Sequence, residues 1–229
     1  MARDSVESPP ARIFLQPLAA PSILGLFGFA AATGLVASHL AGWWGDANTP
    51  FYLAPFAGLV GGVAQLCAGL WAYRARDGLA TAMHGIWGAF WLAYAVLYLA
   101  IAAGVLPQPP AGPAFPALGL WFVALAAVTW FGALAALGES FALLGVLTTL
   151  ATGASLLAAG LIAGSGYLVG VAGWLLVISA LLAWYTAGAL MLEGVFGRPV
   201  LPLGRFSKTR HAPAVAAAAG EPGAQHGRQ

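Results

Sequence analysis

The stretch GGVAQLCAGLWAYRARDGLATAMHGIWGAFWL, residues 61–92, decides the fold. It holds the end of one apolar segment, the basic turn of residues 74–78 and the start of a second apolar segment. Two membrane helices joined by a short cytoplasmic turn have this pattern. Both segments contain glycines, together with Gln65 and His84. Small residues let helix backbones approach closely in lipid, and polar groups at membrane depth face protein or a wet cavity. We therefore expect this hairpin to be buried in a helix bundle.

The composition of the whole chain indicates a polytopic membrane protein. Of its residues, 61% are hydrophobic and 7% are charged, whereas about a quarter of the residues of a soluble domain are charged. The net charge of +2 is too small to predict nucleic acid as a partner. The single cysteine, Cys67, cannot form an internal disulfide and is expected to be a small buried side chain.

Six apolar segments predict the architecture. Each is close to the roughly 20 residues that cross the hydrocarbon core, and continuous runs of this kind must be helical because lipid offers the backbone no hydrogen bonds. The fold class is therefore an all-α membrane protein with six transmembrane helices. The segments span residues 21–41, 51–73, 79–104, 114–137, 141–163 and 167–191.

The ends of the chain have a different composition. Residues 1–19 predict a polar cytoplasmic arm, residues 20–205 the transmembrane domain, and residues 206–229 a disordered cytoplasmic tail.

The basic residues indicate the orientation in the membrane. With six helices, every Lys and Arg falls on one side, which the positive-inside rule assigns to the cytoplasm together with both termini. The connections on the other side, at 42–50, 105–113 and 164–166, carry none. The basic residues are Arg3, Arg12, Arg74, Arg76, Arg198, Arg205, Lys208, Arg210 and Arg228.

Catalytic and metal sites are not expected. The apolar segments contain no HExxH, no GxSxG, no pair of cysteines and no pair of carboxylates, so nucleophilic or metal-assisted catalysis lacks its groups. We expect neither an enzyme nor a cofactor. His84 is interpreted either as a proton-responsive group beside a permeation path or as an interfacial histidine bonded to the neighbouring turn. Gln65 is interpreted either as a pore-lining group or as a bridge between helices, and Glu193 as an ion-pair partner or a solvated group.

Small residues at a spacing of four predict close helix contacts. They occur as Ala54, Gly58 and Gly62, and again at residues 160 and 164 and at residues 166 and 170.

Five stretches of the sequence resemble the acetate uptake transporters, also called succinate–acetate permeases. GLFGF follows Pro21 as in the family's N-terminal signature, and residues 61–74 are similar to its Gly-Gly-x-x-Gln motif. GAFWL at 88–92 resembles the third helix. AGWLL at 172–176 and FGRPVLPLG at 196–204 resemble the sixth helix and its cytoplasmic exit.

The resemblance implies a function and a site. It implies a hexameric ring in the cell membrane with one pore per protomer, passing acetate and similar monocarboxylates, succinate in some members, by proton symport or as a channel. It implies a pore constriction at Phe29, Trp87 and Leu150. The candidates for the substrate path are Pro21, Gly25, Thr33, Gln65, Thr81 and His84.

Departures from the family pattern keep two alternatives open. The signature Asn is Ala20 here, its second Pro is Ile23, and Trp87 stands in the place of a Tyr. The first alternative is a channel for a small neutral solute such as urea or an amide. The second is a membrane scaffold or sensor that transports nothing and binds a partner through the tail.

Overall fold

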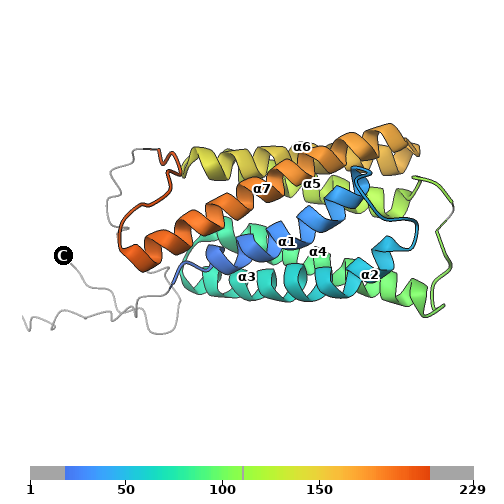
Figure 1. Ribbon diagram of the computed structural model, residues 1–229, viewed down its shortest axis with the longest axis horizontal. Helices are drawn as coiled ribbons and strands as arrows, with labels where there is room; N and C mark the ends of the chain where they lie inside the picture. The colour runs from blue at the N-terminus through green and yellow to red at the C-terminus, as the bar shows by residue number, and fades with distance from the viewer. Residues whose placement is uncertain (1–18, 110, 207–229) are drawn as a thin grey trace, which may run out of the picture. The chain divides into compact units, whose positions relative to one another are not determined.

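The structure is a computed structural model that describes residues 19–109 and 111–206. The predicted cytoplasmic arm and tail, apart from their innermost residues, lie outside the described part. Within that part the chain is mostly helical, and its longest connection joins α4 to α5 (Figure 1). The elements are α1 (Ser22–Leu40), α2 (Thr49–Phe56), the π-helix η1 (Ala57–Val63), α3 (Ala64–Arg74), α4 (Gly78–Ala102), α5 (Pro116–Ala136), α6 (Phe141–Ala163) and α7 (Gly166–Phe196).

Together these elements make six continuous helical spans that are long and apolar enough to cross a membrane, as predicted. The second span, Thr49–Arg74, combines α2, η1 and α3. Pro55 lies inside it and has no N–H to donate to the preceding turn, and the wider π-helical turn follows directly. The end predicted for the last helix was wrong. α7 continues beyond residue 191 through Glu193 to Phe196, where Gly197 ends it in the left-handed conformation with φ 65°.

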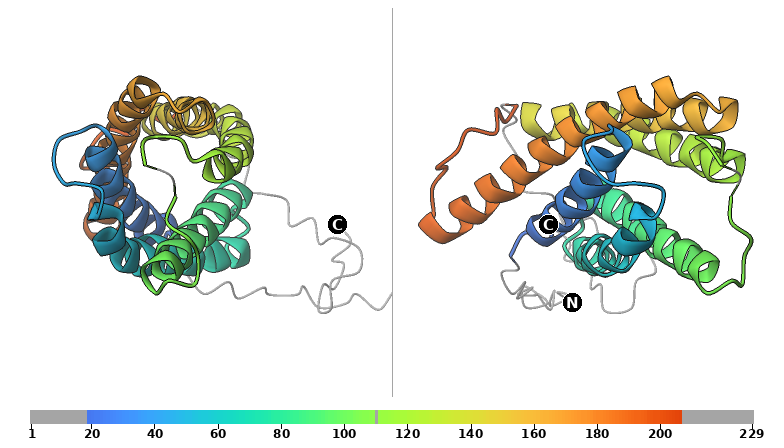
Figure 2. Two further views of the ribbon diagram at one scale, coloured as in Figure 1. Left: turned by 90° about the vertical axis from the view of Figure 1, so that its right-hand side faces the viewer. Right: turned by 45° about the vertical axis from the view of Figure 1, so that its right-hand side comes forward.

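The six spans form a closed ring (Figure 2). Each packs against its neighbour in chain order, and α7 returns to pack against α1. The ring places one face of every helix toward a shared interior, while large apolar side chains such as Trp121 and Phe131 lie exposed on the outside. An exposed apolar exterior is what a lipid-embedded ring requires.

Short side chains define where three of the helices begin. The Asp77 carboxylate accepts a hydrogen bond from the backbone N–H of Ala80 at 2.9 Å and caps α4. Ser140 and Ser165 cap α6 and α7 in the same way. Each cap satisfies a backbone donor that the first helical turn leaves without a partner. These caps allow tight turns between antiparallel spans.

Glycines bring the second span into backbone contact with α4. A Cβ added at Gly88 would lie 2.6 Å from the backbone N of Leu66, and one at Gly58 would lie 2.5 Å from the Ala95 Cβ. The close contacts predicted for residues 58 and 62 are thus present. Gly160 makes a close contact as well, because a Cβ there would lie 2.9 Å from the backbone N of Val169 in α7. The prediction was wrong for Gly170, where a Cβ would meet nothing within 4 Å, and Gly164 ends α6 with φ 67°.

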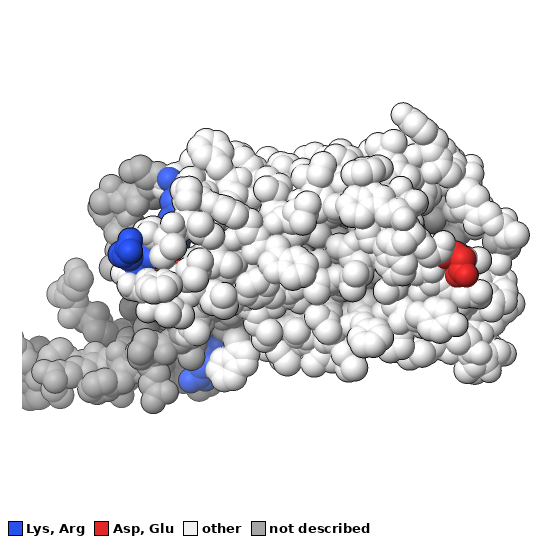
Figure 3. Space-filling view, viewed as in Figure 1, with Lys and Arg blue, Asp and Glu red and all other residues white. Residues whose placement is uncertain are grey.

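Charged residues lie at the two ends of the ring. In Figure 3 the described arginine side chains gather at one end, away from the acidic group at the other. The described basic residues belong to the α3–α4 turn and to the segment after α7, while the α1–α2 connection carries Asp46. This is the one-sided distribution predicted from the sequence.

A strap formed by residues 197–206 crosses the basic end from α7 to the α5–α6 turn. The backbone N–H groups of Phe141 and Ala142 donate to Gly204 and Leu203, and Phe206 donates to Glu139. The strap therefore ties the last helix to the start of α6.

We predict that Gly88→Ala destabilises the protein because the new methyl group has no room against the α3 backbone. Overpacking of this kind costs about 1–3 kcal/mol, so the melting temperature of the detergent-solubilised protein should fall by several degrees. The matched control is Gly85→Ala, one turn away in α4, where a Cβ would meet nothing within 4 Å. Equal melting temperatures for both variants would contradict the close contact.

Candidate functional site

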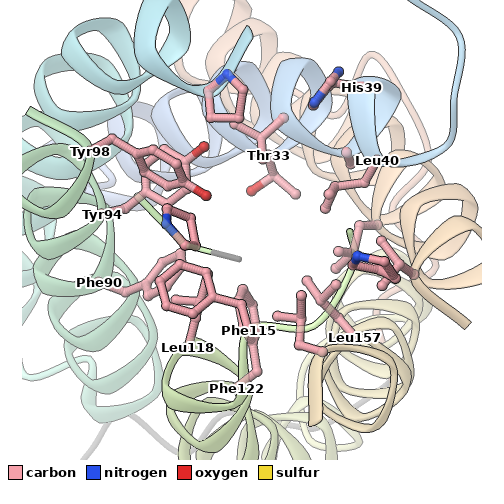
Figure 4. A pocket seen from close by; sticks show the side chains of 18 of the residues that line it. Thr33, His39, Leu40, Phe90, Tyr94, Tyr98, Phe115, Leu118, Phe122 and Leu157 are labelled. Carbon is pink, nitrogen blue, oxygen red and sulfur yellow. The ribbon is translucent and has the colours of Figure 1, made fainter. Parts of the chain in front are cut away.

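The ring encloses a cavity of about 220 Å³ in the half opposite the basic residues. Its lining comes from α1, α2, α4, α5, α6 and α7 and from the connection between α4 and α5. Figure 4 shows this cavity with side chains converging on it from the surrounding helices. Because all six spans contribute, the site exists only when the ring is closed.

One wall of the cavity is polar. Thr33 on α1 and the tyrosines Tyr94 and Tyr98 on α4 direct their hydroxyl groups into the cavity (Figure 4). The two tyrosine rings pack with their centroids 4.6 Å apart. The remaining wall is largely apolar, with Leu118 and Leu157 among its members. No Lys, Arg, Asp or Glu is among the described residues that line the cavity.

Trp87 forms the limit of the cavity toward the basic end. It is 3% exposed, and of the α4 residues that line the cavity it is the one nearest that end. Its ring packs edge-on against Phe29 of α1, with centroids 6.2 Å apart. Its indole N–H donates to the Thr129 hydroxyl at 3.1 Å, and that hydroxyl donates onward to the Leu125 carbonyl. The chain of bonds fixes the Trp87 ring between α1 and α5.

The three residues predicted for the constriction share one buried core. Phe29 and Trp87 are in contact, and Leu150, 2% exposed, belongs to the same cluster. Phe29 and Leu150 do not line the cavity itself. They lie in the packed core together with Trp87, and the constriction stays a prediction.

The predicted path residues fall into two groups. Thr33 lines the cavity. The others lie outside the cavity lining. His84 is buried, and its ring packs against Gly25, because a Cβ added to Gly25 would lie 2.5 Å from the imidazole. Pro21 precedes α1 as its N-cap residue. The hydroxyl of Thr81 donates to the Asp77 carbonyl at 2.7 Å within the first turn of α4.

The amide of Gln65 is satisfied locally. Its Nε2 donates to the carbonyl of Gly61 at 2.9 Å, four residues earlier in the same span. Of the two interpretations of Gln65, the bridge between helices is not made by this nitrogen, whose bond stays within its own span, and Gln65 is not among the residues that line the cavity.

Sequence reasoning missed the residues that make the cavity polar. Tyr94 and Tyr98 were not singled out, nor was the role of Thr129 as partner of Trp87. A signal was present: Trp87, Trp91, Tyr94 and Tyr98 recur at spacings of four, three and four, which places them on one helix face. Aromatic residues in an apolar helix are ordinarily lipid contacts, so the pattern was not recognised.

The charged side chains of the described residues form an ion pair at the basic end and no cluster that resembles a metal site. Among the described residues no group of three or more His, Cys, Asp and Glu side chains could hold a metal ion. At the basic end Arg205 pairs with Glu193 of α7. The hydrogen bonds that Arg205 donates to this carboxylate, together with the negative charge of the carboxylate, raise the pKa of Arg205 above its ordinary value. Because both side chains are partly exposed, the pair adds little to stability.

The arrangement suits the passage of a small polar solute. A ring of helices surrounds a cavity with hydroxyl groups on one wall, and a buried apolar cluster that contains Phe29, Trp87 and Leu150 lies beside it. Weak polar contacts without a fixed charge let a solute enter and leave rapidly.

Comparison with known proteins identifies the family. The family model described as GPR1/FUN34/yaaH matches residues 5–203. The chain belongs to the GPR1/FUN34/yaaH family. It is 33% identical over 187 residues to the succinate-acetate/proton symporter SatP of Escherichia coli. This alignment covers 82% of this chain and 96% of that protein. The chain is equally similar to SatP of Shigella flexneri.

The fold comparison agrees with the family assignment. The solved structure of the bacterial acetate channel SatP superimposes with a TM-score of 0.75 and 31% sequence identity, covering 82% of this chain and 100% of that one. The predicted resemblance to the acetate uptake transporters is thereby confirmed. In this GPR1/FUN34/yaaH family member the cavity, the Trp87 contact and the ring of six spans all lie within the matched residues.

Proposed function

We propose that this chain transports acetate and similar small monocarboxylates, succinate among the candidates, across the cell membrane. The observation that carries the proposal is the match over most of the chain to SatP proteins, described as a succinate-acetate/proton symporter and as an acetate channel. The enclosed cavity and its hydroxyl-bearing wall support it from the physical side.

In this proposal the path runs through the centre of the ring that the six helices of one chain form. A carboxylate enters the cavity beside Thr33 and the Tyr94–Tyr98 pair, then passes the narrowing formed by Phe29, Trp87 and Leu150 on its way to the basic end. Moving a bare anion through an apolar passage is costly. Hydroxyl donors and a co-transported proton offset part of that cost. On this path His84 lies beyond the narrowing, where a proton-responsive group would sense the cytoplasmic side.

The proposed assembly is a homo-hexamer in the plasma membrane with one pore per protomer and both termini in the cytoplasm. The orientation rests on the positive-inside rule, because the described basic residues share one end of the ring. The exposed apolar helix faces provide surface for lipid and for neighbouring copies.

The direct test is labelled acetate uptake into proteoliposomes, with and without an inward proton gradient and with excess urea as competitor. We expect uptake that urea does not reduce. Stimulation by the gradient would identify symport, and indifference to it would identify a channel. Absence of acetate flux from folded protein would contradict the proposal and favour a neutral solute or a non-transporting role.

Trp87 should set the size limit of the passage. We predict that Trp87→Ala raises butyrate uptake relative to acetate about tenfold or more, because removing the indole widens the narrowing. The control is Trp121→Ala, since Trp121 is 68% exposed on the outer face of α5. If Trp87→Ala leaves the acetate-to-butyrate ratio unchanged, Trp87 does not border the path.

A further inference from the structure

A buried imidazole lies between α1 and α4 on the side of Trp87 that faces the basic end. This side chain, His84 of α4, is 5% exposed, and the described residues give its ring nitrogens no hydrogen bond. A Cβ added to Gly25 of α1 would lie 2.5 Å from its Nδ1, so the ring packs directly on the α1 backbone. Buried polar groups ordinarily have a hydrogen-bond partner, and the packing of the helices does not supply one for His84.

The contact between His84 and Gly25 lies on the inner side of the ring. Around the ring the second span packs between α1 and α4. These two helices nevertheless touch at Phe29 and Trp87 and, one turn closer to the basic end, at Gly25 and His84. Trp87 lines the cavity, and residues three apart share a helix face. His84 therefore follows Trp87 along the interior.

The interior around His84 carries little charge. Among the described residues of the six spans, the charged side chains are Arg74 and Glu193, and each lies near the end of its span. The charged group that acts on the imidazole is Asp77. Its carboxylate caps the first turn of α4, and seven residues of helix separate it from His84 by about 10 Å along the axis.

The helices packed against His84 add no nearer counter-charge. α1 presents the backbone of Gly25, and α3 presents Gly69, where an added Cβ would lie 3.4 Å from the carbonyl carbon of His84. The titratable side chains of these two helices are His39, Cys67, Tyr73 and Arg74. Of these, His39 stands at the opposite end of the ring, where it lines the cavity.

Such an environment makes a proton and a carboxylate depend on each other. An imidazolium in an apolar interior is costly without a counter-charge beside it, and so is a carboxylate. When both are present, each neutralises the other. Two ligands that favour each other's binding are thermodynamically coupled, and the coupling acts equally in both directions.

We propose that His84 binds the proton that accompanies the carboxylate through the ring. The substrate crosses the narrowing at Trp87 as the neutral acid. Its O–H bond then breaks, the proton binds an imidazole nitrogen of His84, and the carboxylate stays beside the imidazolium. The carboxylate leaves toward the basic end and the imidazolium releases its proton to the same side, which restores the neutral ring. The inference rests on the proposed function and adds to it the residue that carries the proton.

The test uses the full-length protein in proteoliposomes that contain a pH-sensitive dye. Labelled acetate uptake and internal pH are followed together, with and without an inward proton gradient, and the values for protein-free vesicles are subtracted. For wild type we expect several-fold stimulation by the gradient and about one proton for each acetate. For His84→Gln we expect uptake that is nearly equal with and without the gradient, because the amide binds no proton.

The matched control is Met83→Leu, a change of similar volume at the neighbouring residue of α4. The Met83 side chain packs on Gly132 of α5, where an added Cβ would lie 2.6 Å from its sulfur. Met83→Leu should keep the wild-type stimulation and the ratio of protons to acetate. Thermal melting of both variants shows that they are folded.

Two results would overturn the inference. One is a His84→Gln protein that keeps the wild-type stimulation. The other needs no variant: wild-type acetate flux without accompanying protons removes the inference and leaves the proposed transport intact as that of a channel. Absence of acetate flux from folded wild-type protein contradicts the proposed function itself, so the two failures are distinguishable.

Discussion

The indole of Trp87 holds the interior of the ring together at the level where the cavity ends. It contacts Phe29 of α1 and Phe122 of α5, and it donates to Thr129 of α5. A buried N–H without an acceptor would be costly, so the position of Thr129 determines the orientation of the ring. The aromatic side chain that limits the cavity is therefore fixed by a polar bond, and Phe29 and Phe122 pack around it.

The hydroxyl of Thr33 gives the otherwise apolar ring a polar group on its inner wall. In lipid every backbone group is satisfied within its own helix, so side-chain hydroxyls bond mainly to the preceding turn, as Thr148 and Thr186 do. Thr33 departs from this rule, because its hydroxyl faces the cavity and has no protein partner. A hydroxyl held in this way is available to whatever solute the cavity admits.

Much of the fold was predictable because the bilayer constrains it. Span length, helicity and the one-sided basic residues follow from the thickness and polarity of the membrane, and the predicted spans agree with the observed ones to within a few residues except at the end of α7. That helix continues because the charged Glu193 is no helix breaker, whereas Gly197 is. The site was less predictable. Tyr94 and Tyr98 stand among apolar and aromatic residues of one segment, and only the closed ring shows that their hydroxyls point inward.

The central claim is that acetate passes through the cavity inside the ring. The most direct measurement is acetate uptake by Thr33→Cys in a Cys67→Ser background, before and after reaction with an anionic thiol reagent. The comparison variant is Leu35→Cys in the same background, because Leu35 is 50% exposed on the outer face of α1. We predict that modification abolishes uptake through Thr33→Cys and leaves Leu35→Cys unaffected. Full uptake through a Thr33→Cys protein whose modification is confirmed by mass spectrometry would contradict the account.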